Sequence, residues 1–362
     1  MKKSILFLTG GDRKTPTARL WFYQMADYLN EKGYDARVND YGADKIDYVF
    51  INRLRPDFFL EAYRKYPNAV FGALTTSTEP RRELLQFCDF VLVHSFLMNE
   101  LIQPFVGNVY LRYDYEDLSD RQPKKHGSCD RIVLGYHGNH IHYNNHVVGF
   151  LGNVLERICS ERNVILKVVT NESWKAEVIE GVPTEIYEWE ENSHQNHFHS
   201  FDIGICPTYS SLDELRDMFV SFRDSNRVRT LLAFGIPSVC SPLFESCWQL
   251  RHQEHALFAV SETMWYENLI KLIDKPQLRQ EIGNMGFKLI EEKYSRLTAI
   301  EFVERILSEN QLPRSTKKQG SIEKLIALNA AYQRSQGQAI LLAKTNSMVR
   351  AAARKLGFAS DR

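Results

Sequence analysis

The feature that most constrains this fold is a regular alternation of short apolar runs with helical segments. In the first part of the chain, the apolar runs are SILFL, which begins at Ser4, and residues 47–53, 68–74, 89–95 and 108–114. Segments with helical spacing of apolar residues, such as the one around Leu20–Leu29, lie between them. Strands that alternate with helices form βαβ units, and βαβ units build a parallel sheet with helices on both faces.

A second series of the same kind follows a polar segment, residues 117–130, which contains proline and glycine. Its strands are predicted at 131–138, 164–170, 183–189, 201–207, 236–242 and 255–261, and its helices at 145–162, 226–234, Thr263–Ile273 and Gln277–Asn310, the last broken near Lys293–Ser295. The sequence therefore predicts an α/β protein with two tandem doubly wound domains, 1–125 and 126–311, and a cleft between them.

Residues 312–362 differ from the rest of the chain in charge. From Arg314 to Arg362 there are ten Lys/Arg and two Asp/Glu, a balance of +8 in a chain of zero net charge. Apolar residues at helical spacing make this a basic amphipathic tail, which suits an anionic membrane surface or a protein partner. The alternative is a solvated end, or a helix packed on the body or on a second copy of the chain. The acidic body argues against nucleic acid as a partner.

The cysteine pattern and the N-terminus indicate a cytoplasmic protein. The six cysteines are scattered without a C-x-x-C pair, so we expect reduced thiols. The apolar run after Met1 is about five residues, shorter than the ~7–15 of a secretory signal. No stretch approaches the ~20 apolar residues of a membrane span.

The stretch SNRVRTLLAFGIPSVCSP, residues 225–242, places Asn226, Arg227 and Arg229 at the start of a predicted helix. Cations are unfavourable at a helix N-terminus unless an anion binds there, and arginine matches phosphate oxygens. We therefore expect Asn226 and Arg227 to bind phosphate. The alternative is surface ion pairs of Arg227 and Arg229 with Asp224 and Asp217.

Histidines are concentrated in GYHGNHIHYNNH, residues 135–146, between a predicted strand and helix. Their mixed spacing and the lack of a carboxylate argue against a metal site. We expect His137 to act in catalysis and His142 to donate to a diphosphate or sugar hydroxyl, while Asn139 can lie in a turn. Gly138 permits a close backbone approach.

Two loops of the first half follow strands and are candidates for the acceptor side of the cleft. Arg13, Thr15 and Arg19 lie in the glycine loop 10–19, and we expect them to bind a substrate. Glu79, in the loop 75–82, is a candidate general base. Its alternative role is to cap the next helix or to be solvated.

The second half resembles the donor domain of GT-B fold glycosyltransferases, especially the large family-four type of bacterial sugar transferases. The matching segments are FDIGICP (201–207), Arg227, AFGIPSVCS (233–241) and the run from Leu272 to Ser295, with LGYHGNHIH resembling the start of the family's donor domain. The likeness spans roughly residues 1–310 and is loose in the first half.

The resemblance implies a glycosyltransferase, of hexosyltransferase type, that moves a sugar from a nucleotide-diphospho-sugar to a glycan or lipid-linked acceptor in cell-surface polysaccharide synthesis. By this resemblance Arg227 grips the diphosphate, and Gly138 and Asn139 approach the diphosphate or sugar. Glu188 and Trp189 line the nucleobase and ribose. No cofactor and no obligatory metal are expected.

The chain departs from the family at two positions. Many members carry E-x₇-E, where this sequence has Phe222 and Thr230. Retaining or inverting stereochemistry is therefore not assigned. The alternatives are a non-catalytic binding or scaffold relative, which the missing glutamates favour, and a sugar-nucleotide epimerase, which the scarcity of acidic residues in the cleft argues against.

Overall fold

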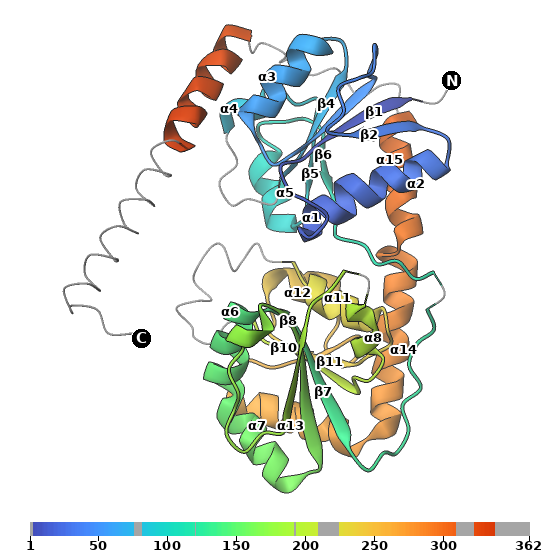
Figure 1. The fold of residues 1–362 in the computed structure, drawn as a ribbon. Helices are drawn as coiled ribbons and strands as arrows, with labels where there is room; N and C mark the ends of the chain where they lie inside the picture. Colours follow the sequence, from blue (N-terminus) through green and yellow to red (C-terminus); the bar gives the residue numbers. More distant parts are fainter. Residues whose placement is uncertain are drawn as a thin grey trace, which may run out of the picture.

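The computed structural model describes residues 3–75, 82–119, 121–191, 193–208, 224–308 and 322–336. Within these residues the chain forms two six-stranded sheets, each covered by helices, one above the other in Figure 1. Every described strand pairing is parallel. The predicted α/β fold with two doubly wound sheets is confirmed.

The first sheet has the strand order β2-β1-β3-β4-β5-β6. Its strands are β1 (Ser4–Leu8), β2 (Asp35–Val38), β3 (Tyr48–Asn52), β4 (Val70–Thr75), β5 (Phe90–Val93) and β6 (Val109–Leu111). Its helices are α1 (Pro16–Ala18), the π-helical η1 (Arg19–Gln24), α2 (Met25–Glu31), α3 (Pro56–Lys65), α4 (Arg82–Leu85) and α5 (Phe96–Ile102). The strands read as nearly continuous apolar runs because both faces of the sheet are buried.

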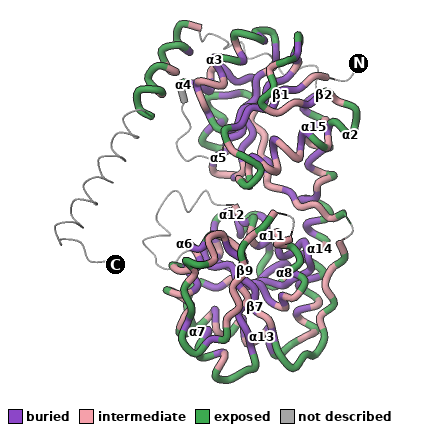
Figure 2. The backbone as a smooth tube through the Cα atoms, in the orientation of Figure 1, coloured by how far each residue is buried: buried purple, intermediate pink, exposed green. Residues whose placement is uncertain are grey.

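The second sheet has the strand order β12-β11-β10-β7-β8-β9. Its strands are β7 (Ile132–Asn139), β8 (Val164–Asn171), β9 (Thr184–Glu188), β10 (Ile203–Cys206), β11 (Ser238–Cys240) and β12 (Leu257–Phe258). Its helical segments are α6 (His140–His142), the π-helical η2 (Tyr143–Val148), α7 (Gly149–Glu161), η3 (Ser173–Lys175), α8 (His194–Phe198), α11 (Asn226–Leu232), α12 (Phe244–Gln249), α13 (Glu262–Asp274) and α14 (Pro276–Lys293). Figure 2 shows that buried residues concentrate along the central strands of both domains.

The chain crosses back to the first domain after α14. Helix α15 (Arg296–Ser308) follows α14 after two residues, and its buried Ile300, Val303 and Ile306 belong to the same apolar cluster as Phe7 of β1. At the crossing, Glu116 and Ser295 form a parallel bridge, so the two connections between the domains lie side by side. The sequence-based division groups α15 with the second domain, whereas its side chains pack on the first (Figure 1).

A glycine in the motif AFGIP fixes the turn between α11 and β11. Gly235 has φ +68°, in the left-handed region that disfavours a side chain, and a Cβ there would lie 2.8 Å from Pro123 and from the backbone of Lys124. Glycine at this position therefore permits both the turn and the close packing of the interdomain linker against it.

Part of the predicted tail is described, as a helix over residues 322–336. Its Leu325 is fully buried in the apolar cluster of the first domain, and Lys324 Nζ donates to Gln86 Oε1 at 3.0 Å. The rest of the tail, 312–321 and 337–362, lies outside the described residues. No helix in the described part of the chain is long and apolar enough to cross a bilayer. All six cysteines are free thiols.

Candidate active site

A cavity of about 410 Å³ lies between the two domains. The first domain contributes Pro16, Thr17, His94 and Asp114 to its wall, and the second contributes Asn139, His142, Cys206, Thr208, Asp224, Ser225, Asn226, Arg227, Val228, Cys240, Ser241, Leu243 and Ser246. Most of these residues follow the carboxyl ends of strands or begin a helix, which is where open α/β sheets bind ligands. The cavity is therefore the candidate site.

Arg227 places a guanidinium on the cavity wall. Its Nη1 donates to the Tyr136 hydroxyl at 3.2 Å, and its Nη2 donates to the Pro207 carbonyl at 3.2 Å and to Thr208 Oγ1 at 3.4 Å. These neutral acceptors orient the guanidinium, and none of the described carboxylates forms an ion pair with it. A guanidinium held in this way is suited to bind an anion such as a diphosphate.

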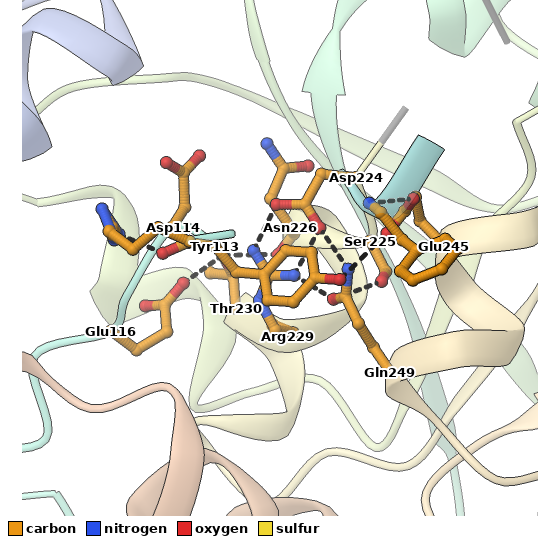
Figure 3. A network of polar contacts seen from close by, with 12 residues as sticks. Tyr113, Asp114, Glu116, Asp224, Ser225, Asn226, Arg229, Thr230, Glu245 and Gln249 are labelled. Atoms are coloured by element: carbon orange, nitrogen blue, oxygen red, sulfur yellow. Dashed lines mark hydrogen bonds and ion pairs between the residues drawn. The ribbon is translucent and has the colours of Figure 1, made fainter. Parts of the chain in front are cut away.

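Arg229, two residues further on, is occupied instead. Its side chain is 1% exposed, its two terminal nitrogens bind both oxygens of Asp224, with Nη2–Oδ2 at 2.6 Å, and it also donates to Gln249. Burial acts to raise the pKa of Asp224, but the charge and hydrogen bonds of Arg229, together with smaller contributions from His94 and Gln249, outweigh burial, and the pKa is lowered. Figure 3 shows this buried pair beside Asp114, Asn226 and Glu245. The alternative to phosphate binding, an ion pair with a nearby aspartate, thus applies to Arg229 with Asp224. Asp217 lies outside the described residues.

Some residues of the histidine-rich segment 135–146 line the cavity, and others hold the elements that form its wall. Asn139 and His142 line the cavity, as expected for residues that would bind the donor. His137 Nε2 donates to the backbone carbonyl of Arg227 at 2.9 Å, its ring packs on Phe198, and burial lowers its pKa to about 4. His137 is thus a neutral donor that holds the first turn of α11, and it does not belong to the described cavity wall.

Gly138 lies beside the predicted phosphate-binding arginine. Its φ is +150°, and a Cβ would lie 2.8 Å from the Tyr136 hydroxyl and 3.4 Å from Arg227 Cδ. Glycine here therefore leaves room for both groups. Among the described residues no cluster of three or more His, Cys, Asp or Glu could hold a metal ion.

Arg19 of the first domain contacts Trp189 of the second. The sequence had predicted that Arg19 binds the acceptor and that Trp189 binds the donor. Trp189 packs on His194 at 4.9 Å between ring centroids, and the Arg19 guanidinium lies 5.1 Å from the Trp189 ring. Burial lowers the pKa of Arg19, while Glu191, Glu116 and Asp114 oppose this shift. Glu188 accepts from the backbone N–H groups of Glu172 and Ser173, at 2.9 and 2.7 Å. The described cavity wall does not include these residues.

The other predicted acceptor residues make local contacts next to the cavity. Arg13 pairs with Asp27 at 3.1 Å and lies over the ring of Tyr23. Thr15 Oγ1 donates to Asp12 at 3.3 Å, and the residues that follow it, Pro16 and Thr17, line the cavity. Glu79, the predicted general base, lies outside the described residues.

Several cavity residues were missed from the sequence. His94 and Asp114 enter from the first domain, and Thr208, Asp224, Ser225, Ser241 and Ser246 from the second. His94 directly follows β5, and Asp114 comes three residues after β6. The rule that ligands bind at the carboxyl ends of parallel strands was the available indication for both.

Thr230 stands where many family-four members carry a glutamate, and it lies next to an acidic side chain. Thr230 Oγ1 donates to Glu116 Oε1 at 2.6 Å, and Arg121 lies 3.5 Å from the same carboxylate. Burial raises the pKa of Glu116, and Arg121 and Thr230 oppose that shift. The interdomain linker thus supplies a carboxylate beside Thr230.

No protein-family model matches the sequence, and no curated protein is similar to it in sequence. Solved structures are similar in fold at low identity. A glycosyltransferase from Rickettsia africae ESF-5 has a TM-score of 0.65 at 10% identity, over 86% of this chain and 100% of that one. Sucrose-phosphate synthase from Thermosynechococcus elongatus has a TM-score of 0.63 at 10% identity (84% and 98% covered). HepE of Anabaena, in complex with UDP and glucose, has a TM-score of 0.60 at 11% identity (85% and 100% covered). The two sheets, the crossing helix and these similarities show that the chain has the GT-B fold.

Proposed function

We propose that this protein transfers a sugar from a nucleotide-diphospho-sugar to a glycan or lipid-linked acceptor. The observation that carries the proposal is the Arg227 guanidinium, which faces an interdomain cavity with no carboxylate paired to it in the described part of the chain. Similar folds occur in glycosyltransferases, one of them solved with UDP and glucose. These similarities support the proposal at the level of fold.

In the proposed reaction the bond between the anomeric carbon and the diphosphate oxygen breaks, and negative charge develops on the diphosphate. Arg227 stabilises that charge, because a preorganised cation in a cleft needs no reorganisation as the charge develops. Asn139, His142 and Asn226 line the same cavity and supply hydrogen bonds to the donor. Since Arg227 provides the positive charge, we expect neither a resident cofactor nor an obligatory metal.

The first test is a thermal-shift panel of UDP-, GDP-, ADP-, CMP- and dTDP-sugars on wild type and Arg227→Ala. At a ligand concentration of 100 times Kd, binding stabilises the fold by about 2.7 kcal/mol. We expect one nucleotide class to stabilise the wild type and the shift to vanish in R227A. The matched control is Arg157→Ala, which removes an arginine whose side chain is 61% exposed, on α7. An equal donor shift in R227A would refute the assignment.

A non-catalytic role is the second candidate, and Thr230 in place of the family's glutamate favours it. In that case the protein binds a sugar donor weakly or not at all, and the panel gives little or no shift with any of the five nucleotide classes. Product analysis by chromatography separates a transferase from an epimerase, because only a transferase links the sugar to an acceptor.

For the setting of the reaction, we propose a cytoplasmic protein that is peripheral at an anionic membrane and acts in surface polysaccharide synthesis. The basic tail supports this, since positive charge on an amphipathic segment attracts anionic lipid. Co-sedimentation with vesicles of anionic and of neutral lipid, with full-length chain and a chain ending at residue 336, tests it. Binding that is equal for both lipids or for both chains contradicts it.

A further inference from the structure

Two cysteines lie side by side in the wall of the interdomain cavity. Cys206 is the last residue of β10 and Cys240 the last residue of β11, and the two are register partners in these parallel strands. Register partners on neighbouring strands point their side chains to the same face of a sheet. Both cysteines belong to the cavity wall that also holds Arg227, and they are 3% and 1% exposed. The second domain therefore brings two free thiols together at the candidate site.

The spacing of the two thiols fits a disulfide. Neighbouring strands lie about 4.8 Å apart, and the Cα atoms of a disulfide lie about 4.4–6.8 Å apart. The Cβ atoms of a disulfide are closer together, at about 3.5–4.5 Å, so the bond would draw the ends of β10 and β11 toward each other. In the described strand pairings, no other two cysteines are register partners.

The segments that follow these two strands carry the groups that orient Arg227. Its Nη2 donates to the Pro207 carbonyl at 3.2 Å and to Thr208 Oγ1 at 3.4 Å, and both residues follow directly on the end of β10. The Thr208 N–H donates to Ser241 Oγ at 3.0 Å, and the Ser241 N–H donates to the Cys206 carbonyl at 3.3 Å. A shift of β10 against β11 is therefore passed through these hydrogen bonds to the acceptors of the guanidinium.

The two thiols differ in their electrostatic surroundings. Burial raises the pKa of Cys206 to about 12, while the positive charge of Arg227 acts in the opposite direction. Burial also raises the pKa of Cys240, and the neighbouring thiols Cys206 and Cys247 add to that shift. Because the thiolate is the nucleophile, both thiols react slowly at pH 7, and we expect Cys206, the one beside a cation, to react first.

We propose that Cys206 and Cys240 form a reversible disulfide when the protein meets a peroxide, and that this bond weakens binding of the sugar donor. Cys206 Sγ attacks one peroxide oxygen and becomes a sulfenic acid, and water leaves. Cys240 Sγ then attacks the sulfenic sulfur, the S–S bond forms, and a second water leaves. The two sulfurs together give up two electrons, and one hydrogen peroxide is reduced to two waters. Formation of the bond is independent of the proposed function, whereas its effect on donor binding rests on it.

The first measurement is peptide mapping by mass spectrometry of the full chain, after treatment with hydrogen peroxide and blocking of the remaining thiols. We expect one peptide pair joined through Cys206 and Cys240, which dithiothreitol separates. The matched variant is Cys129→Ala/Cys247→Ala, which removes the two exposed thiols, makes the assignment to Cys240 unambiguous and should form the bond as the wild type does. Well below the pKa the thiolate fraction rises tenfold per pH unit, so the rate of formation should rise about tenfold from pH 7 to pH 8.

The second measurement is the thermal shift given by the donor that the nucleotide-sugar panel identifies, on reduced and on oxidised protein. We expect the oxidised protein to bind the donor about tenfold or more weakly, because contacts of a guanidinium with a diphosphate are charge-assisted, and dithiothreitol to restore binding. The control is Cys206→Ala, which lacks the first nucleophile, so peroxide should leave its donor binding unchanged.

The outcomes separate the inference from the proposed function. No Cys206–Cys240 peptide after peroxide, or Cys240 joined to Cys247 instead, overturns the inference. A disulfide that leaves the donor Kd unchanged, or an equal peroxide effect in C206A, overturns it as well. A reduced wild type that binds no nucleotide-sugar refutes the proposed function, and peptide mapping then still decides whether the bond forms, so the two failures are distinguishable.

Discussion

Replacing Arg229 by methionine tests how the candidate site is held together. The substitution keeps a long apolar stem but removes a guanidinium that is 1% exposed and binds both oxygens of Asp224, whose side chain is 6% exposed. Asp224 is then a buried carboxylate without its cation. Breaking a buried pair by removing one partner costs about 3–5 kcal/mol, and we expect R229M to lose that much unfolding free energy at pH 7.

The double variant Asp224→Asn/Arg229→Met separates the lost charge from the lost packing. It removes the unpaired carboxylate, so we expect it to recover at least ~2 kcal/mol relative to R229M, within the range of coupling energies for contacting residues. Arg162→Met is the matched control. It breaks a pair of similar geometry with Asp274, at 2.9 and 3.0 Å, whose side chains are 40% and 42% exposed. An exposed pair contributes about 0–1 kcal/mol, so R162M changes stability little.

The assay is urea unfolding followed by circular dichroism at several pH values. Burial acts to raise the pKa of Asp224, but Arg229, with smaller contributions from His94 and Gln249, outweighs burial, so the pKa is lowered in the folded protein. The pair therefore stabilises the fold above the unfolded-state pKa of about 3.9, and this contribution is lost as pH falls through the lower folded-state pKa. The deficit of R229M should be largest at pH 7. It shrinks as pH falls, first because burial without Arg229 raises the pKa of Asp224 in the variant, and then below about pH 4 because the wild-type pair is itself lost. A deficit under ~1 kcal/mol at pH 7, or a double variant no more stable than R229M, refutes the reasoning.

Substitutions at three further positions test packing and hydrogen bonding in the fold. Gly283→Ala places a Cβ 2.2 Å from the Gly235 carbonyl oxygen, so despite alanine's helix propensity we expect a loss of ~1–3 kcal/mol in thermal unfolding; an unchanged Tm contradicts this. Ile306→Ala should cost about 2–5 kcal/mol and raise hydrogen exchange in the first sheet; an increase confined to the second sheet contradicts the packing of α15. Glu245 accepts from the Phe96 N–H at 2.7 Å and from the Tyr113 hydroxyl at 3.1 Å, so Glu245→Ala should cost ~1–3 kcal/mol in urea unfolding and Glu245→Gln clearly less; equal losses would mean that the hydrogen bonds are not responsible.

The architecture was accessible from the sequence because parallel strands buried on both faces leave continuous apolar runs. The run at 131–138 corresponds to β7 (Ile132–Asn139), and the predicted break near Lys293–Ser295 falls between α14 and α15. The π-helical turns η1 and η2 were not predicted, since one residue added to a turn hardly changes the pattern of apolar residues.

The candidate site was only partly accessible from the sequence. Arg227 and Arg229 are two residues apart on one short helix, and nothing in the pattern says which of them meets Asp224 and which meets the cavity. His94 and Asp114 come together because β5 and β6 are neighbours in the sheet, and strand order is a property of the folded chain. His137 was expected in catalysis, and its contact with the Arg227 backbone depends on how β7 and α11 approach each other.

The return of α15 to the first domain has a consequence for how the protein is made. Synthesis proceeds from the N-terminus, so the last strand of the first sheet, β6, is complete at Leu111, whereas the helix that contacts Tyr48 and Tyr110 of that sheet ends at Ser308. Throughout the synthesis of the second domain, the nascent first domain exposes this apolar face, as would any fragment that ends at the linker. The apolar clusters of the second domain are complete at Tyr294, whereas those of the first need Leu307 and Leu325, so the second domain is the first to have all its core residues synthesised.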